Sequence, residues 1–219
     1  MSRLLMSTVE HYGVRYVIND WMEGQQGNCN HALATTQWSY LKKKLAELTE
    51  VVLIQSDANC PDLVFTANAG TVRGDTVVLS HFKHKERQLE EPIFRDWFLD
   101  NGYKVLRMPE DVFFEGAGDS LFSATADTLW MGYGFRSDLS AGSYLEQFLG
   151  VDVLTLKLID SKFYHLDTCF CPLVSGYVMY YPAAFDAESN AKIESYYPSS
   201  QRIAVTELDA KLFACNAVS

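Results

Sequence analysis

The sequence lacks a long hydrophobic run and carries little positive charge. Its 219 residues include 18 Lys and Arg against 28 Asp and Glu, which gives a formal charge of −10 at pH 7. No apolar segment approaches the roughly 18 residues that a membrane-spanning helix needs, and residues 1–10 lack the charged and apolar regions of a secretion signal. We therefore expect a cytoplasmic protein with no membrane and no nucleic acid as partner, because phosphate groups would be repelled.

Paired cysteines are also absent. The five cysteines show no disulfide-type spacing, so we expect them to be reduced. Cys169 and Cys171 leave one residue between them, whereas zinc-ligand pairs leave two to four, and a second pair is lacking. We predict no metal and interpret these two cysteines as small core residues on one face of a strand.

The sequence contains no Pro-rich or Gly/Ser-rich linker. Hydrophobic residues make up 48% and charged residues 21%, which is the composition of an ordinary globular protein. We therefore predict a single domain over residues 1–219.

A polar residue in apolar surroundings recurs at intervals of 48 to 51 residues, at Asn68, Asp119, Asp167 and Asn216. A turn signal and then an apolar strand follow the first three. The expected turns are residues 73–75, 124–127 and 175–176, and the expected strands are residues 76–79, 128–132 and 177–181.

A helix pattern and another strand follow each expected hairpin. Pro92 near a start and Asn101-Gly102 at a stop bound one helix, and Gly150 closes another. The expected helices are 92–100, 144–149 and 188–196, and the strands after them are 104–107, 151–156 and 202–205. Upstream, Trp38, Leu41, Leu45 and Leu48 mark one face of a helix before a strand at 51–54.

The repeating unit is therefore strand, strand, helix, strand, over about fifty residues. Such units favour an α/β fold in which similar strand ends surround a common axis. We expect four units, with a fifth that opens at residues 212–219 and is incomplete within this chain.

The recurring polar residues would point to the centre of such a ring. A guanidinium group presents five N–H donors, so carboxylates and amide oxygens are suitable partners for it. Simpler readings exist: a strand-end amide at Asn68, a capped turn at Glu115–Asp119, and a structural pair of His165 and Asp167 on one strand face. Their shared place in the repeat favours a binding site, with this inventory: Asn19, Asn68, Glu115, Asp119, His165 and Asp167.

Three segments, residues 61–70, 115–119 and 165–173, together resemble the guanidino-modifying enzymes of the pentein fold. That superfamily includes dimethylarginine dimethylaminohydrolase, arginine deiminase, the amidinotransferases and arginine dihydrolase. Residues 16–22, 84–88, 132–137 and 213–216 are most similar to arginine dihydrolase. The resemblance runs from about Tyr12 to Ser219, and Asp20 stands where a proline would be expected.

The resemblance implies a pentein-type α/β propeller of pseudo-fivefold repeats, with the fifth unit incomplete. It implies that His165 is the general acid and base and that Glu115 and Asp167 hold the guanidinium. Arg87 and Arg136 would hold the substrate α-carboxylate, although without the family they read as solvated surface arginines. The full implied set of substrate-binding residues is Asn19, Phe65, Asn68, Arg87, Asp119 and Arg136.

The implied reaction is hydrolysis of L-arginine to ornithine, ammonia and carbon dioxide without a cofactor. Family members use a cysteine nucleophile some fifty residues beyond Ser219, so the chain as given is expected to be inactive. Asn68 stands where deiminases commonly have Asp, which favours the dihydrolase. A dimethylarginine dimethylaminohydrolase or deiminase that forms citrulline, an arginine-binding pseudoenzyme, and a homo-oligomer all stay open.

Overall fold

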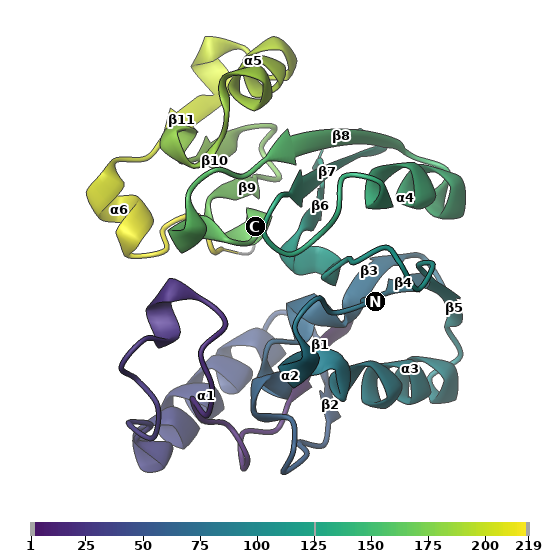
Figure 1. The fold of residues 1–219 in the computed structure, drawn as a ribbon, viewed down its shortest axis with the longest axis vertical. Helices are drawn as coiled ribbons and strands as arrows, with labels where there is room; N and C mark the ends of the chain where they lie inside the picture. The colour runs from purple at the N-terminus through teal and green to yellow at the C-terminus, as the bar shows by residue number, and fades with distance from the viewer. Residues whose placement is uncertain (1–2, 125, 218–219) are drawn as a thin grey trace.

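The protein is described here from a computed structural model, which covers residues 3–124 and 126–217. Three consecutive segments repeat the order strand, strand, helix, strand (Figure 1). The first has β3 (Gly70–Arg73), β4 (Thr76–Leu79), α3 (Glu90–Asp100) and β5 (Lys104–Arg107). The second has β6 (Ser120–Phe122), β7 (Thr128–Tyr133), α4 (Ala141–Leu149) and β8 (Asp152–Lys157). The third has β9 (Phe170–Pro172), β10 (Val178–Tyr180), α5 (Ala187–Tyr196) and β11 (Arg202–Ala204).

Each segment folds into its own three-stranded sheet. The first two strands are antiparallel and the third is parallel to the second, with the helix as the crossover. The expected order of elements is confirmed, with bounds that differ by a few residues. A short helix, α2 (Lys85–Gln88), precedes α3, and α6 (Glu207–Lys211), which we did not expect, follows β11.

The N-terminal segment has only part of this unit. β1 (Arg3–Ser7) pairs in parallel with β2 (Glu50–Ile54), and α1 (His31–Ala46) connects them. Within the described residues β1 has no antiparallel partner, unlike β4, β7 and β10. The expected helix is present in α1, but Leu48 lies beyond its end and is 85% exposed.

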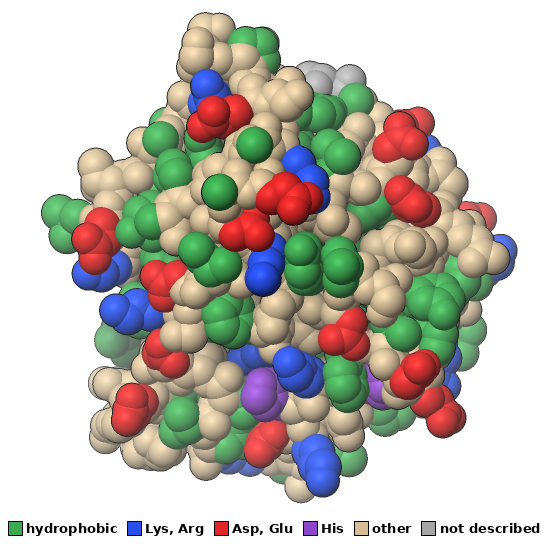
Figure 2. Space-filling view, turned by 45° about the horizontal axis from the view of Figure 1, so that its top comes forward, with side chains coloured by type: hydrophobic (Ala, Val, Ile, Leu, Met, Phe, Trp, Pro, Cys, Tyr) green, Lys and Arg blue, Asp and Glu red, His purple; other side chains and the backbone are tan. Residues whose placement is uncertain are grey.

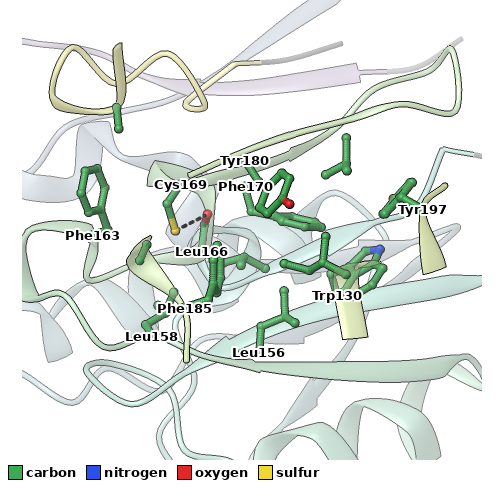
Figure 3. Packing of buried hydrophobic residues seen from close by; sticks show 14 residues of the cluster. Trp130, Leu156, Leu158, Phe163, Leu166, Cys169, Phe170, Tyr180, Phe185 and Tyr197 are labelled. Carbon is green, nitrogen blue, oxygen red and sulfur yellow. Dashed lines mark hydrogen bonds between the residues drawn. The ribbon is translucent and has the colours of Figure 1, made fainter. Parts of the chain in front are cut away.

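Side chains of the middle strands alternate between two hydrophobic clusters. On β7, Leu129 and Met131 pack with α4, whereas Trp130 points the other way and packs with Ile193 of α5 and with β10. Alternation along a strand explains this, because successive side chains leave opposite faces of a sheet. Figure 3 shows Trp130 between Leu156, Phe170 and Tyr197, so the second sheet and the third share one core.

Short 3-10 helices precede the first strand of each sheet. They are η3 (Thr66–Ala69), η4 (Gly116–Gly118) and η6 (Leu166–Thr168), and η4 contacts both of the others. The recurring polar residues therefore lie at or beside these turns and not within strands. His165 and Asp167 do not share a strand face, and Cys169 precedes β9, although Cys169 and Cys171 are both buried.

The start of a fifth unit was expected to be strand-like. Instead, residues 212–215 form a turn and residues 216–217 have no regular structure. Residues 218–219 lie outside the described part, as does Thr125 in the expected turn at 124–127. No helix within the described ranges is long and apolar enough to cross a membrane. Acidic and basic side chains are interspersed over the face that Figure 2 shows, without a continuous basic patch on it.

Candidate functional site

A cavity of about 420 Å³ opens where η3 and η6 meet the N-terminal segment 12–22. It contains most of the residues that the sequence singled out, from separate stretches of the chain. Its lining comprises Tyr12, Val14, Ile18, Asn19, Trp21, Met22, Asp62, Phe65, Ala67, Asn68, Arg87, Arg136, Tyr164, His165, Asp167, Thr168, Phe213 and Asn216.

His165 lies at the inner end of this cavity, with only 5% of its surface exposed. Its Nε2 is 3.4 Å from Oε2 of Glu115, and its Nδ1 is 3.1 Å from Oδ1 of Asp119. The second contact is close but poorly aligned, and Nδ1 has no well-formed hydrogen bond. The imidazole is thus held between two buried carboxylates from opposite ends of η4.

Glycine permits this close packing of the three turns. A Cβ on Gly118 would lie 2.2 Å from Nδ2 of Asn68 and 3.4 Å from Nδ1 of His165. Gly116 adopts a φ of 62°, and a Cβ there would lie 2.8 Å from the backbone nitrogen of Gly70. The glycines of the Glu115–Asp119 motif therefore bring Asn68 and His165 together.

Glu115 and Asp119 lie behind the imidazole and do not line the cavity themselves. Burial raises the pKa of Glu115, but the charges of His165 and Arg136 outweigh it and leave the pKa lowered. Asp119 accepts hydrogen bonds from Ser137 Oγ at 2.6 Å and from the Leu166 N–H at 3.1 Å. Both carboxylates are thus fixed in place by the protein.

Asp167, two residues after His165, also lines the cavity and is partly buried. Loss of hydration raises its pKa to about 7, and the opposing charge of His165 does not restore the usual value. The backbone oxygen of Asp167 accepts a hydrogen bond from Asn216 Nδ2 at 3.3 Å. A cation bound beside Asp167 would lower this pKa and be attracted by the carboxylate.

Arg87 and Arg136 also lie in the cavity wall, and each is only 3% exposed. The alternative interpretation, that they are solvated surface arginines, is therefore wrong. Arg87 forms a two-pronged ion pair with Glu90, with N–O distances of 2.9 and 2.7 Å. Arg136 pairs with Glu115 at 3.0 Å, and its guanidinium stacks on the Tyr164 ring at 4.5 Å. Each buried positive charge therefore has a buried negative partner.

Both amides already use their oxygens for contacts within the protein. Oδ1 of Asn19 accepts from the N–H groups of Trp21 and Met22, where it caps η1 (Asp20–Met22). Oδ1 of Asn68 accepts from Arg87 Nη1 at 3.0 Å. The Asp167 carboxylate, which lines the cavity, is therefore better placed than the two amide oxygens to receive a guanidinium.

Sequence reasoning did not assign a role to Asp62 or Glu90. Asp62 lines the cavity, is 3% exposed, and accepts a hydrogen bond from Tyr16 at 3.0 Å. Burial raises the pKa of Asp62, and the Arg87 charge opposes that rise. Its position inside the 61–70 motif and the three-residue spacing from Arg87 to Glu90 were available signals.

Aromatic side chains surround the cavity mouth. Phe65 is 45% exposed, and its ring meets the edge of Tyr12 with centroids 6.2 Å apart. Trp21 packs against Phe213 with centroids 4.8 Å apart, and its Nε1 donates to Lys162 O at 2.7 Å. Contacts of Trp21 to residues 162 and 213 thus hold the segment 12–22 over the cavity.

The buried cysteines lack the features of a nucleophile. Burial raises the pKa of Cys60 to about 11 and that of Cys215 to about 12, and it also raises the pKa values of Cys169 and Cys171. A reactive cysteine needs a lowered pKa and access to substrate, and none of the five cysteines lines the cavity. In residues 3–124 and 126–217, no group of three or more potential ligands is arranged to hold a metal ion.

Comparison with known proteins gives close matches. The chain is 53% identical over 217 residues to the bifunctional arginine dihydrolase/ornithine cyclodeaminase ArgZ of Synechocystis, covering 99% of the chain and 31% of that relative. It is 33% identical to the dimethylarginine dimethylaminohydrolase of Mycobacterium tuberculosis, covering 99% of the chain and 70% of the relative. The chain thus spans about a third of the length of the cyanobacterial relative.

Solved structures agree with these matches. The N-terminal domain of ArgZ, as a cysteine-to-serine mutant bound to substrate, superposes with a TM-score of 0.97 at 53% identity and covers 99% of this chain and 80% of that one. A dimethylarginine dimethylaminohydrolase matches with a TM-score of 0.79 at 17% identity, over 98% of this chain and 79% of that one, which shows the fold alone. The fold and the relatives place the chain in the superfamily of guanidino-modifying enzymes, which have a pentein-type α/β fold.

The family model described as N,N dimethylarginine dimethylhydrolase, eukaryotic, matches residues 17–219. The chain belongs to this dimethylarginine dimethylaminohydrolase family, within which its relatives include arginine dihydrolases.

Proposed function

We propose that this chain forms the substrate-binding and acid–base part of an arginine dihydrolase, which converts L-arginine and two waters to ornithine, two ammonia and carbon dioxide. The observation that supports this most is the lining of the cavity, where His165 and Asp167 lie together with two buried arginines. Asp167 offers a carboxylate to a guanidinium, and Arg87 and Arg136 offer N–H donors to a carboxylate. L-arginine carries both of these groups.

Most of the expected residues have a role in this proposal, but Glu115, which was expected to hold the guanidinium, does not line the cavity. Asp167 faces the guanidinium, Arg87 and Arg136 hold the α-carboxylate, and Asp62 attracts the α-ammonium. Glu115 and Asp119 contact His165 and stabilise its protonated, positively charged imidazolium form. Asn19 and Phe65 close the cavity, the first with its free amide nitrogen and the second with its ring at the mouth.

A cysteine thiolate would attack the guanidinium carbon, and His165 would give a proton to the departing ammonia. The neutral imidazole would then take a proton from the attacking water. A second round of ammonia loss and water attack would give a carbamate that breaks down to ornithine and carbon dioxide. Stopping after the first hydrolysis would give citrulline.

The nucleophile in this proposal is not one of the five cysteines of the chain. All four buried cysteines have raised pKa values, and related structures were solved with cysteine-to-serine and cysteine-to-alanine mutants bound to substrate or L-arginine. The proposal therefore places the nucleophile in a fifth propeller unit, in the part of that unit that this chain does not contain. Such a unit would also supply the antiparallel strand that β1 lacks within the described residues.

We also place the protein in the cytoplasm, which agrees with five free cysteines. The test of the function is product analysis on the protein expressed from its own reading frame, including whatever follows Ser219. Arginine labelled at the guanidino carbon should yield ornithine and labelled carbon dioxide. Citrulline as the sole product would support a deiminase, and binding without turnover would support a pseudoenzyme. Release of dimethylamine from N,N-dimethylarginine, supplied in a parallel sample, would support a dimethylarginine dimethylaminohydrolase.

A further inference from the structure

Nε2 of His165 lies between two groups with opposite demands. It is 3.4 Å from Nδ2 of Asn68, which is a donor, and 3.4 Å from Oε2 of Glu115, which is an acceptor. A ring with a lone pair on Nε2 suits Asn68, whereas a ring with a proton on Nε2 suits Glu115. The orientation of the Asn68 amide therefore influences which nitrogen carries the proton.

Arg87 fixes that orientation. Its Nη1 donates to Oδ1 of Asn68 at 3.0 Å, and Nδ2 of Asn68 donates to the backbone oxygen of Glu115 at 3.1 Å. A guanidinium has no acceptor, so a flipped amide would place two donors against each other. The flip would also set the amide oxygen against the Glu115 carbonyl. The amide is thus locked with its NH₂ group toward His165.

Glu90 in turn fixes Arg87. Its two oxygens accept from Nε at 2.9 Å and from Nη2 at 2.7 Å, and it is fully buried. The Arg87 guanidinium also lies over the Phe82 ring at 4.4 Å. With Nε and Nη2 held by the carboxylate, Nη1 is left to reach Asn68.

We infer that Glu90, which does not line the cavity, is a positioning residue that acts through Arg87 and Asn68 to keep Nε2 of His165 unprotonated. This is the form that takes a proton from water, so the inference deepens the proposed function and rests on it. The other groups beside the ring are the carboxylates of Glu115, Asp119 and Asp167, the Tyr164 ring at 4.9 Å, and Arg136, which pairs with the same Oε2 of Glu115. The three carboxylates favour the protonated imidazolium, whereas the Arg136 charge and, at Nε2, the Asn68 amide oppose it.

The test reads the tautomer directly, without turnover. Two-bond proton–nitrogen spectra of ¹⁵N-labelled protein, at a pH where the ring is neutral, separate the Nδ1–H and Nε2–H forms. His165 is assigned among the five histidines by the signal lost in His165→Gln. We expect the unmodified protein to show the Nδ1–H form and Glu90→Gln to gain the Nε2–H form. Glu86→Gln, an exposed change on the preceding short helix α2, should match the unmodified protein.

Glu90→Gln leaves the buried Arg87 charge without its charged partner and could therefore unfold the protein. A second variant keeps the inference testable in that case. In Arg87→Met with Glu90→Met both charges are removed, and such apolar replacements of buried ion pairs are often tolerated. The donor to Asn68 is lost here too, so the Nε2–H form should again appear. An unchanged His165 tautomer in the folded double variant would overturn the inference.

The same samples separate this inference from the proposed function. L-arginine binding is measured by calorimetry on the unmodified protein. If the tautomer changes in the variants but the unmodified protein does not bind L-arginine, the proposed function is wrong and the positioning role of Glu90 holds. If the unmodified protein binds L-arginine and the tautomer is the same in all variants, the positioning role is wrong and the proposed function holds.

Discussion

His165 is surrounded by more negative than positive charge at close range. Glu115, Asp119 and Asp167 all lie near its ring, while Arg136 is already paired with Glu115. Such a site stabilises the protonated imidazole and attracts a guanidinium, because fixed carboxylates need no reorganisation during reaction. An oxyanion hole would have the wrong sign here.

Asn68→Asp should shift the products from ornithine toward citrulline in the complete protein. The native amide donates toward His165 Nε2, whereas a carboxylate in its place accepts a proton from it. His165 would then be held protonated and would activate the second water poorly. The ratio of ornithine to citrulline, measured by chromatography, checks this expectation.

The control for that change is Asn28→Asp, an exposed asparagine outside the cavity. It adds the same charge and should leave the product ratio unchanged. Equal ornithine output from Asn68→Asp and the unmodified protein would show that Asn68 does not decide the outcome.

Asp167 should make the protein less stable as the pH rises from about 4 to about 7. Its pKa in the folded protein is about 7, above the ordinary value of 3.8. The folded state therefore binds more protons than the unfolded state in this window, and the free energy of unfolding falls with rising pH. Asp167→Asn should remove this slope.

The measurement is urea unfolding of Asp167→Asn and the unmodified protein at pH 5 and pH 8. The variant should gain stability relative to the unmodified protein at pH 8, while Asp111→Asn, an exposed change, should show no such gain. A difference between variant and parent that is the same at both pH values would contradict the shift.

At the scale of elements, the site depends on the contact of η4 with η3 and η6. Gly118→Ala should destabilise the protein by about 1–3 kcal/mol, as overpacking of a tight interior does. The new Cβ would lie 2.2 Å from Asn68 Nδ2, so Asn68 must move away from His165. Urea unfolding and calorimetry should show lower stability and weaker L-arginine binding.

Gly13→Ala is the matched control, since a Cβ there has nothing within 4 Å. It should change neither quantity by much. Normal stability and binding in Gly118→Ala would mean that the turns tolerate separation, and the packing argument for the site would fail.

Much of the element order was predictable because local signals coincide with it. β4 and β5 have the expected bounds, and α4 ends at Gly150, which adopts a φ of 63°. Left-handed glycine at a helix end is a signal that sequence carries directly. Of the 3-10 turns, only the one at Glu115–Asp119 was among the readings of the sequence. We missed η3 and η6 because contacts between units set them, which no local pattern reveals.

The site was predictable in membership but not in geometry. The cavity holds Asn19, Asn68, His165 and Asp167, which the sequence brought together from their place in the repeat and from family motifs. The pairing of Arg87 with Glu90 was not foreseen, because the sequence does not show that the guanidinium is buried. Burial decides whether a charge needs a partner.

At the scale of the whole molecule, apolar side chains are exposed on helix α1 near the N-terminus and at helix α6 near the C-terminal end. Leu33 and Leu41 of α1 are 52% and 51% exposed, and Leu208 and Leu212 at α6 are 70% and 74% exposed. No residue of α1 is fully buried. In the middle segments, α3, α4 and α5 each bury such side chains against a neighbouring sheet.

We therefore expect the isolated 219-residue chain to self-associate or to need a partner, since ordinary monomers rarely carry large apolar patches. Light scattering should show a mass that rises with concentration. Leu208→Lys with Leu212→Lys should reduce this association. Ser39→Lys should not, because Ser39 is exposed and has Thr35 and Lys43 as neighbours one turn away on the polar face of α1. A concentration-independent monomer would contradict the expectation.

The isolated chain should release no ammonia from L-arginine above background. Covalent catalysis needs a thiolate within reach of the bound guanidinium carbon, and no cysteine lines the cavity. Weak binding should survive, because Asp62, Asp167 and the two paired arginines are all present in the cavity wall. An enzyme-coupled ammonia assay and calorimetry on the same sample measure the two properties. Turnover by a rigorously pure sample, abolished by Cys169→Ala, Cys171→Ala or Cys215→Ala, would place the nucleophile within this chain and overturn the proposal that it lies elsewhere.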